Sequence, residues 1–199
     1  MICTLQLVRH GKTEAVPKKI YCGVTDLPLS EEGIREIRAF VEEGLYRPAE
    51  AHFSSGLRRA VQTLALIAGE VSWEELADLR ECNFGEFEQR RHEELLENEA
   101  YQKWISDETG TFSCPGGEST VAFNQRVDRG WDALFSRVRA LGVSSALVTA
   151  HGGSLAQFAR RFLNPSWNLY EAMPSHARGF RVRVLLEENR AEVLDWEKI

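Results

Sequence analysis

Residues 4–11 read TLQLVRHG, so that an apolar run passes directly into a charged turn. The run Thr4–Val8 is short, apolar and partly β-branched, which is typical of a buried strand. Residues 145–153 read SALVTAHGG and repeat the pattern, and residues 51–56, AHFSSG, form a third short strand ahead of a glycine. The sequence therefore predicts three strands that each end in a polar turn.

Segments with helical spacing of apolar residues alternate with these strands. Ser30 is a predicted N-cap for a helix that ends at Gly44, because Glu31 and Glu32 then fall in its first turn. The other predicted elements are helices from about 56 to 69, 88 to 106 (charged and exposed), 118 to 140 and 152 to 162, a loop over 107–117, and closing strands over 179–186 and 191–196. This alternation predicts an α/β fold with a mainly parallel central sheet.

Length and composition exclude several classes. The chain has 199 residues, with 24 Lys and Arg against 30 Asp and Glu, and a formal net charge of −6. One domain fits this length, and the acidic balance argues against a general nucleic-acid binder. No apolar run is long enough to span a membrane, and the first residues lack the cation-first pattern of a signal peptide. Four scattered cysteines indicate reduced thiols in a cytoplasmic protein, not a zinc site or a disulfide framework.

Positive and imidazole side chains gather at the predicted strand ends. The first strand delivers Arg9 and His10, the second Arg58 and Arg59, and the third His151. In parallel sheets the carboxyl ends of strands form the ligand-binding edge, and helix N-termini there favour anions. Because phosphate accepts forked arginine contacts, the sequence predicts a phosphate pocket in an otherwise acidic protein.

Two histidines in such a pocket predict catalysis as well as binding. A neutral imidazole is a nucleophile toward phosphorus when one nitrogen is bare and the other proton is held by a hydrogen bond. Flanking cations stabilise the charge on the transferred group, and a carboxyl group supplies the proton that the leaving oxygen needs.

The motifs, taken together, resemble those of the histidine phosphatase superfamily, in its phosphoglycerate mutase-like branch. They occur in the expected order at residues 7–11 (LVRHG), 23–33 (GVTDLPLSEEG), 55–63 (SGLRRAVQT), 79–88 (LRECNFGEFE), 115–119 (PGGES) and 149–154 (TAHGGS). The resemblance covers about residues 4–155. It implies a three-layer α/β/α sandwich over a single domain, 1–199, with residues 86–117 as a variable helical and loop cap over the site.

The resemblance also implies a role for each matching residue. His10 is the expected nucleophile, Glu81 the acid and then the base, and Arg9, Arg59 and His151 the groups that hold the phosphoryl oxygens. Arg59, and not Arg58, directly precedes the alanine of its motif. The expected substrate-binding residues are Gly11, Thr13, Cys22, Gly23 and Gly152. The family uses no metal, and we expect no cofactor.

Two positions depart from the family pattern. Val16 stands where many members carry Asn, and Ile20 where many carry Arg. Because Gly23 keeps its register, these are substitutions and not a misalignment. Val16 removes a donor from the phosphate pocket, and Lys18 or Lys19 is a candidate replacement from the same loop.

The expected function is hydrolysis of a small phosphomonoester through a phosphohistidine. The alternatives are a mutase, which is less favoured because residues 84–148 lack the long insertion of bisphosphoglycerate mutases, and a catalytically silent phospho-ligand binder. We expect a small-molecule phosphate ester as partner, no nucleic acid or membrane, and leave the oligomeric state open, with a homodimer as one option. His52 is expected to be structural, and His92 and Arg58 to be solvated. His176 is ambiguous between the pocket mouth and a structural role, and Trp104 and Phe112 are either core or substrate contacts.

Overall fold

The computed structural model describes residues 1–188 and 190–199. Within these residues, six strands form one sheet in the order β3-β2-β4-β1-β5-β6. The strands are β1 (Ile2–Arg9), β2 (Ala51–Ser54), β3 (Glu74–Glu75), β4 (Ser145–Ala150), β5 (Gly179–Leu186) and β6 (Ala191–Lys198). The pairs β1–β4, β2–β4 and β2–β3 are parallel, whereas β1–β5 and β5–β6 are antiparallel. The mainly parallel sheet is confirmed, and it aligns the carboxyl ends of β1, β2 and β4.

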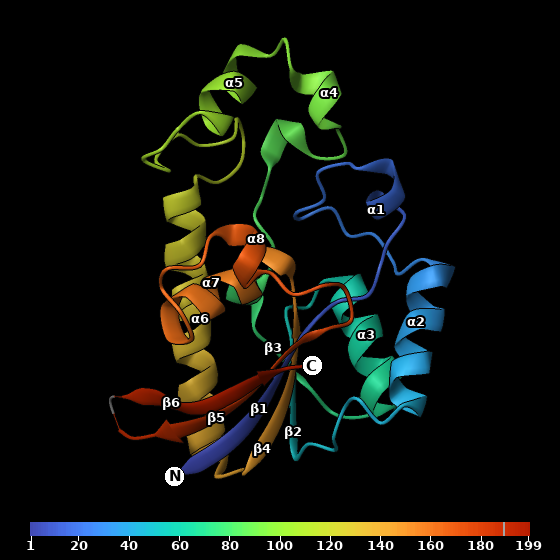
Figure 1. The fold of residues 1–199 in the computed structure, drawn as a ribbon, viewed down its shortest axis with the longest axis vertical. Coiled ribbons are helices and arrows are strands. Elements are labelled where there is room, and N and C mark those ends of the chain that lie inside the picture. The colour runs from blue at the N-terminus through green and yellow to red at the C-terminus, as the bar shows by residue number, and fades with distance from the viewer. Residues whose placement is uncertain (189) are drawn as a thin grey trace.

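Helices cover both faces of this sheet (Figure 1). α2 (Glu31–Glu42) and α3 (Arg58–Ala68) lie on one face, and α6 (Thr120–Leu141) and α7 (Gly152–Phe162) on the other. The predicted cap Ser30 accepts a hydrogen bond from the Gly33 amide. Gly142 ends α6 in the left-handed conformation, which glycine adopts without steric cost. The predicted three-layer α/β/α sandwich is therefore confirmed.

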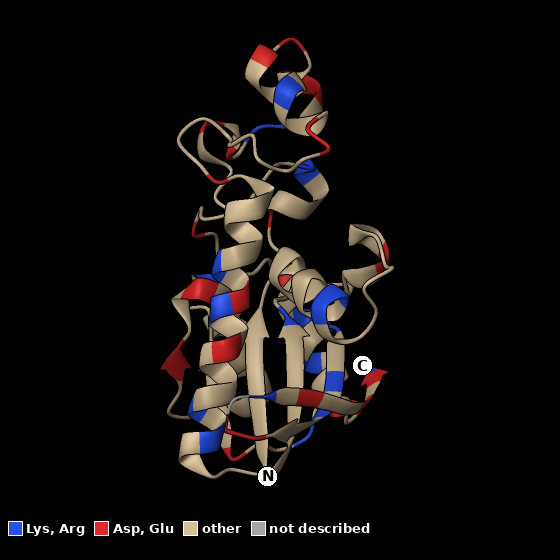
Figure 2. Ribbon diagram, turned by 90° about the vertical axis from the view of Figure 1, so that its left-hand side faces the viewer, with Lys and Arg blue, Asp and Glu red and all other residues tan. Residues whose placement is uncertain are grey.

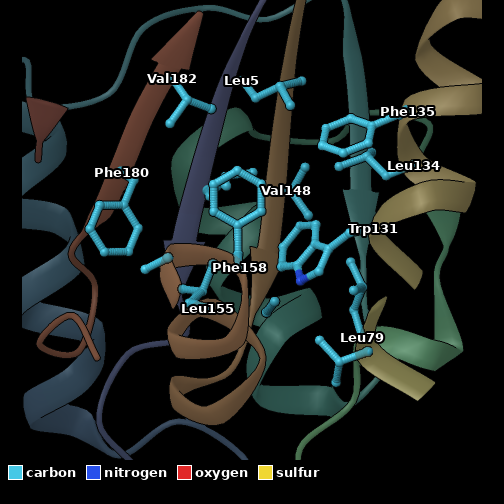
Figure 3. Close-up of a cluster of buried hydrophobic side chains, with 14 of the residues drawn as sticks. Leu5, Leu79, Trp131, Leu134, Phe135, Val148, Leu155, Phe158, Phe180 and Val182 are labelled. Carbon is cyan, nitrogen blue, oxygen red and sulfur yellow. The ribbon is translucent and has the colours of Figure 1, made fainter. Parts of the chain in front are cut away.

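The alternation of β1 side chains creates a core on each side of the sheet. Leu5 and Leu7 pack in the larger cluster with α6 and α7, whereas Val8 points to the other face and packs with Leu64 of α3. Figure 3 shows the larger cluster, whose labelled members come from β1, β4, β5, α6, α7 and the short turn η1 (Ala77–Leu79). In its middle, the Trp131 ring meets Phe158 nearly edge-on at 5.0 Å. The core thus holds the strand ends rigidly in place.

The predicted exposed helix over residues 88–106 is wrong. The chain there forms a turn η2 (Gly85–Phe87) and two short helices, α4 (His92–Leu95) and α5 (Glu99–Ile105). Gln89 adopts a positive φ of 58°, and Asn98 starts α5 by accepting the Tyr101 amide. The segment is also not solvated throughout, because the buried side chains of Phe87, Leu95, Tyr101 and Cys114 form a separate aromatic core. These contacts outweigh the charged pattern that predicted one exposed helix.

Four other short elements escaped prediction. α1 (Ala15–Lys18) lies in the predicted loop, with Pro17 in its first turn where proline is tolerated. The others are β3, η1 and α8 (Leu169–Ala172). Charged residues lie mainly on the helices and the outer strands (Figure 2). Among the described residues, no helix combines the length and apolar character needed to cross a membrane.

Candidate active site

The register of the parallel strands brings three strand ends together. Arg9 pairs with Ala150, and Ser54 pairs with Thr149. Two further backbone hydrogen bonds extend this alignment past the strands, because the His10 amide donates to the Ala150 carbonyl at 2.9 Å and the Ser55 amide to the Thr149 carbonyl at 3.2 Å. The turns predicted to carry chemistry therefore meet at one edge of the sheet.

His10 is buried and its tautomer is fixed. Its Nδ1 lies 2.7 Å from the Gly11 carbonyl oxygen, which can only accept, so Nδ1 carries the proton. Its Nε2 accepts from the Nε of Arg59 at 3.2 Å. Burial first, and then the neighbouring His151, Arg59 and Arg9, lower the pKa of His10 well below its ordinary value. The ring is a neutral imidazole with a lone pair on Nε2.

Arg59 is fully buried and oriented by the loop that precedes it in sequence. Its Nη1 donates to the Thr25 carbonyl at 2.8 Å and its Nη2 to the Gly23 carbonyl at 2.6 Å. Glu88 holds that loop, since its carboxylate accepts from the amides of Gly23, Val24 and Thr25. Gly23 has no room for a side chain, because a Cβ there would lie 1.7 Å from the Cys82 carbonyl oxygen. Glu88 thus positions Arg59 through the loop.

His151 forms the second imidazole of the site. It is completely buried, and its ring centroid lies 5.1 Å from that of His10. Its Nε2 lies 2.7 Å from the Ser55 hydroxyl, whereas its Nδ1 has no hydrogen-bond partner among the described residues. Burial, and then Arg59 and Arg9, lower its pKa well below the ordinary value. When Ser55 donates to Nε2, Nδ1 carries the proton and is free to donate to an anion.

Arg9 and Glu81 complete the predicted cluster. Arg9 donates from Nη1 to the Pro174 carbonyl at 2.8 Å, and its buried Nε has no partner within the described part of the chain. Glu81 accepts from the Gly153 amide at 3.0 Å, at the N-terminus of α7. Gly152 lets the N-terminus of α7 lie close to the Arg9 side chain, because a Cβ on Gly152 would lie 3.0 Å from the Arg9 Cζ.

A cavity of about 310 Å³ opens onto this cluster. Its walls are formed by Arg9, His10, Thr13, Ala15, Val16, Lys19, Ile20, Tyr21, Cys22, Glu81 and His176. Thr13 and Cys22, both expected to bind substrate, lie in this wall. Gly11, Gly23 and Gly152 are not among the wall residues, and the Gly11 amide donates to the Thr63 hydroxyl at 3.0 Å. The three glycines therefore shape the site through close packing and do not line it.

The departures from the family pattern lie on the α1 side of the cavity. Val16 and Ile20 make this wall apolar. Of the two lysines considered as replacements, Lys19 lines the cavity and Lys18 is not part of its wall. Lys19 ends α1 in a left-handed conformation, with φ 52°. Arg58 is exposed, as expected, and only its backbone is engaged, by Asp26 at 2.6 Å.

Four residues of the site received no role from the sequence. Ser55, Thr63 and Glu88 lie within matching motifs, and that proximity was the only available signal. His176 was left ambiguous, and the structure places its ring 5.5 Å from that of His10, in the cavity wall. His92 was expected to be solvated, and although exposed its Nδ1 lies 2.6 Å from the Tyr101 hydroxyl. Trp104 packs on Tyr21 and Phe84 in the aromatic core.

The buried histidines make the fold sensitive to mild acid. His10 and His151 have strongly lowered pKa values, and burial, Arg9 and Lys12 lower that of His176 to about 3. In the unfolded chain these histidines bind protons below about pH 6.5. The unfolded state then holds more protons than the folded state, so stability falls as pH falls below that value, by up to about 1.4 kcal/mol per pH unit for each histidine.

We therefore expect urea unfolding to give a free energy of unfolding that drops between pH 6.5 and pH 5, a window above the titration of most carboxylates. The His176→Asn variant should show a shallower drop, because one of the three lowered pKa values is removed. Equal free energies of unfolding at both pH values would contradict neutral burial of these rings.

The side chains that form the site are suited to binding an anion. Among residues 1–188 and 190–199, no three His, Cys, Asp or Glu side chains group in a way that could hold a metal ion. The cluster instead gathers Arg9, Arg59 and three imidazoles with lowered pKa values, and of these Arg9, His10 and His176 line the cavity. Such a set binds a tetrahedral oxyanion and offers a bare imidazole nitrogen to its central atom.

Comparisons with known proteins agree with this geometry. The model of the histidine phosphatase superfamily (branch 1) matches residues 5–198. The adenosylcobalamin/alpha-ribazole phosphatase of Salmonella typhimurium is 32% identical over 164 residues, which cover 80% of this chain and 79% of that protein. A 2,3-bisphosphoglycerate-dependent phosphoglycerate mutase of Rhizobium etli is 31% identical over 164 residues, covering 76% and 75%. The crystal structure of the alpha-ribazole phosphatase from Shigella flexneri superimposes with a TM-score of 0.79 at 26% identity, covering 96% of this chain and 94% of that one.

The fold and the family match together define the class of this protein. The chain belongs to the histidine phosphatase superfamily, branch 1. It is a phosphatase, and a phosphate ester is its substrate class.

Proposed function

We propose that the chain hydrolyses a small phosphomonoester by transferring its phosphoryl group to His10. In the first step, the Nε2 lone pair of His10 attacks phosphorus, an N–P bond forms and the ester P–O bond breaks. The protonated carboxyl group of Glu81 gives its proton to the leaving oxygen. In the second step, Glu81 as carboxylate takes a proton from water, whose oxygen attacks phosphorus as the N–P bond breaks. The net products are the alcohol and inorganic phosphate.

One observation carries this proposal, namely the fixed neutral tautomer of His10. The Gly11 carbonyl holds the Nδ1 proton, and the Nε2 lone pair points toward the Arg59 guanidinium. A nucleophile that is already deprotonated and oriented needs no base to activate it. A ligand that only had to be bound would not require this arrangement, which therefore favours the enzyme over the silent binder.

The remaining charged groups act on the phosphoryl oxygens in this proposal. Arg9 offers its Nε and His151 its Nδ1, two buried atoms that have no partner among the residues that the structure describes. Preorganised donors in a buried site stabilise developing charge strongly, because they need no reorganisation during the reaction. Glu81 keeps its orientation through the Gly153 amide.

For the alcohol half of the substrate we propose a chemical class. α-Ribazole phosphate is the first candidate because relatives with that activity match four-fifths of the chain. The apolar wall of Ala15, Val16 and Ile20, with Tyr21 beside it, suits a partly apolar group. A sugar phosphate is the second candidate. We also propose that residues 86–117 cap this cavity, since Tyr21 of its wall is hydrogen-bonded to Gln89 and Arg90 of that segment.

The cellular setting stays an expectation from the sequence. The four cysteines are free thiols. Reduced thiols are typical of the cytoplasm, where we propose that the protein acts.

A direct assay separates hydrolysis from the alternatives. With p-nitrophenyl phosphate and with α-ribazole phosphate, we expect release of inorganic phosphate, unchanged by EDTA. With 3-phosphoglycerate, we expect free phosphate and no 2-phosphoglycerate, as read by ³¹P NMR. Accumulation of 2-phosphoglycerate would establish the mutase, and no turnover with any substrate between pH 5 and pH 8 would leave only the binder.

A further inference from the structure

His176 is the one histidine of the cavity wall to which the proposed reaction gives no role. Its ring is half-buried and meets the ring of His10 edge-on, with centroids 5.5 Å apart. It comes from the loop between α8 and β5, so His10 has a second imidazole neighbour besides His151. Among the described residues, its ring nitrogens have no hydrogen-bond partner, and burial, Arg9 and Lys12 lower its pKa. Its nitrogens are therefore free for a ligand.

The loop that carries His176 is fastened to the catalytic strand end. The Ala177 amide donates to the Arg9 carbonyl at 3.0 Å, and the Ala177 carbonyl accepts the Tyr46 hydroxyl at 2.6 Å. Arg9 itself binds the Pro174 carbonyl. Ala177 adopts a positive φ of 57°, a conformation that costs energy for alanine and that these contacts maintain. The His176 ring is thus held in place beside the nucleophile.

The α1 side of the cavity offers few donors. Ala15, Val16 and Ile20 are apolar there, and Lys19 supplies a cation. Arg59 already uses Nε on His10 and both Nη atoms on backbone carbonyls. A phosphoryl group has three oxygens to satisfy, and an unsatisfied charged oxygen in a buried site is costly. A further donor beside His10 meets that need.

We propose that His176 is a further substrate-contact residue, whose neutral imidazole donates a ring N–H to a phosphoryl oxygen of the group held at His10. The inference rests on the proposed function, because it assumes that a phosphoryl group occupies the cavity. Arg9 and Lys12 are the cations that oppose protonation of the ring, and the neutral His10 ring meets it edge-on. The ring therefore acts as a neutral donor across the neutral pH range, and its removal should not shift the limbs of the pH–rate profile.

Two variants distinguish donation from packing. His176→Phe keeps an aromatic edge against His10 but has no nitrogen, whereas His176→Gln keeps an N–H donor. We expect His176→Phe to lower kcat/KM for p-nitrophenyl phosphate, and to weaken competitive inhibition by inorganic phosphate, each by about 10- to 100-fold. His176→Gln should stay within about fivefold of the wild type, because a charged acceptor needs only one donor there. His52→Phe, on a half-buried histidine outside the cavity, is the matched control and should change neither value.

The outcomes separate this inference from the proposed function. If the wild type is active and the kcat/KM of His176→Phe matches it within twofold, the ring only packs against His10. In that case this inference fails while the proposed function stands. If the wild type neither hydrolyses the ester nor binds inorganic phosphate in a calorimetric titration, the proposed function fails and this inference with it. If the acid limb of the pH–rate profile shifts in His176→Gln, the wild-type ring titrates during catalysis. That result would contradict its role as a neutral donor. Where His176→Phe does not fold, His176→Ala provides the same test without added bulk.

Discussion

His10→Ala is expected to lower kcat/KM for phosphomonoesters by about 10⁴-fold or more, the scale seen when a covalent nucleophile is lost. The loss follows from the geometry, because the unprotonated His10 Nε2, which accepts from Arg59 at 3.2 Å, is the atom that attacks phosphorus in the proposed reaction. The measurement is steady-state hydrolysis of p-nitrophenyl phosphate, with inorganic phosphate binding followed in parallel. Binding should fall far less than turnover, because Arg9 and His151 remain.

The matched control for this prediction is His52→Ala. His52 lies on β2, three residues before Ser55, and lines a different surface hollow. Its removal tests whether loss of any half-buried imidazole near the sheet edge disturbs catalysis. If His10→Ala kept a tenth or more of wild-type activity, His10 would not be the nucleophile.

The Glu81→Gln substitution is expected to slow the hydrolysis of esters whose leaving oxygen needs a proton. An alkyl phosphate needs a proton on its departing oxygen, so its turnover should fall by about 10²- to 10⁴-fold. p-Nitrophenolate leaves without a proton, so its first release should be little changed, while the second step slows because no carboxylate activates water. The expected signature is a burst of p-nitrophenolate, close to one per active site, before a slow steady state in a stopped-flow trace.

Glu86→Gln is the control, since Glu86 is an exposed carboxylate five residues further along the same segment. It should show neither the burst nor the leaving-group dependence. Equal losses for alkyl and p-nitrophenyl esters in Glu81→Gln would assign Glu81 to binding and not to proton transfer.

The strand ends and their chemistry were predictable because they are local in sequence. Thr4–Val8 reads as a buried strand, and the next two residues carry the chemistry, so parallel pairing alone brings Arg9, His10 and His151 to one edge. Arg59 was separable from Arg58 by its motif, and the structure buries the first and exposes the second. Short elements governed by turns and caps were the parts most open to error.

The features that could not be predicted depend on contacts between segments that are distant in sequence. The 86–117 segment breaks into short helices because Tyr101 and Phe87 find partners in Tyr21 and Cys114, which no local pattern reveals. His176 lies 166 positions beyond His10 and reaches it only through the bonds of Ala177 to the strand end. The anchoring of the Arg59 loop by Glu88 is similarly long-range. Such residues carry no recognisable local periodicity, so only the fold exposes them.

The most direct test is to locate the transferred phosphoryl group itself. Glu81→Gln is mixed with p-nitrophenyl phosphate, quenched in alkali, where phosphohistidine survives, and digested for peptide mass analysis. We expect one acid-labile phosphoryl group per chain, on His10, in an amount equal to the burst of p-nitrophenolate. A phosphoryl group on any other residue, or a burst with no phosphorylated peptide, would contradict attack by the His10 imidazole.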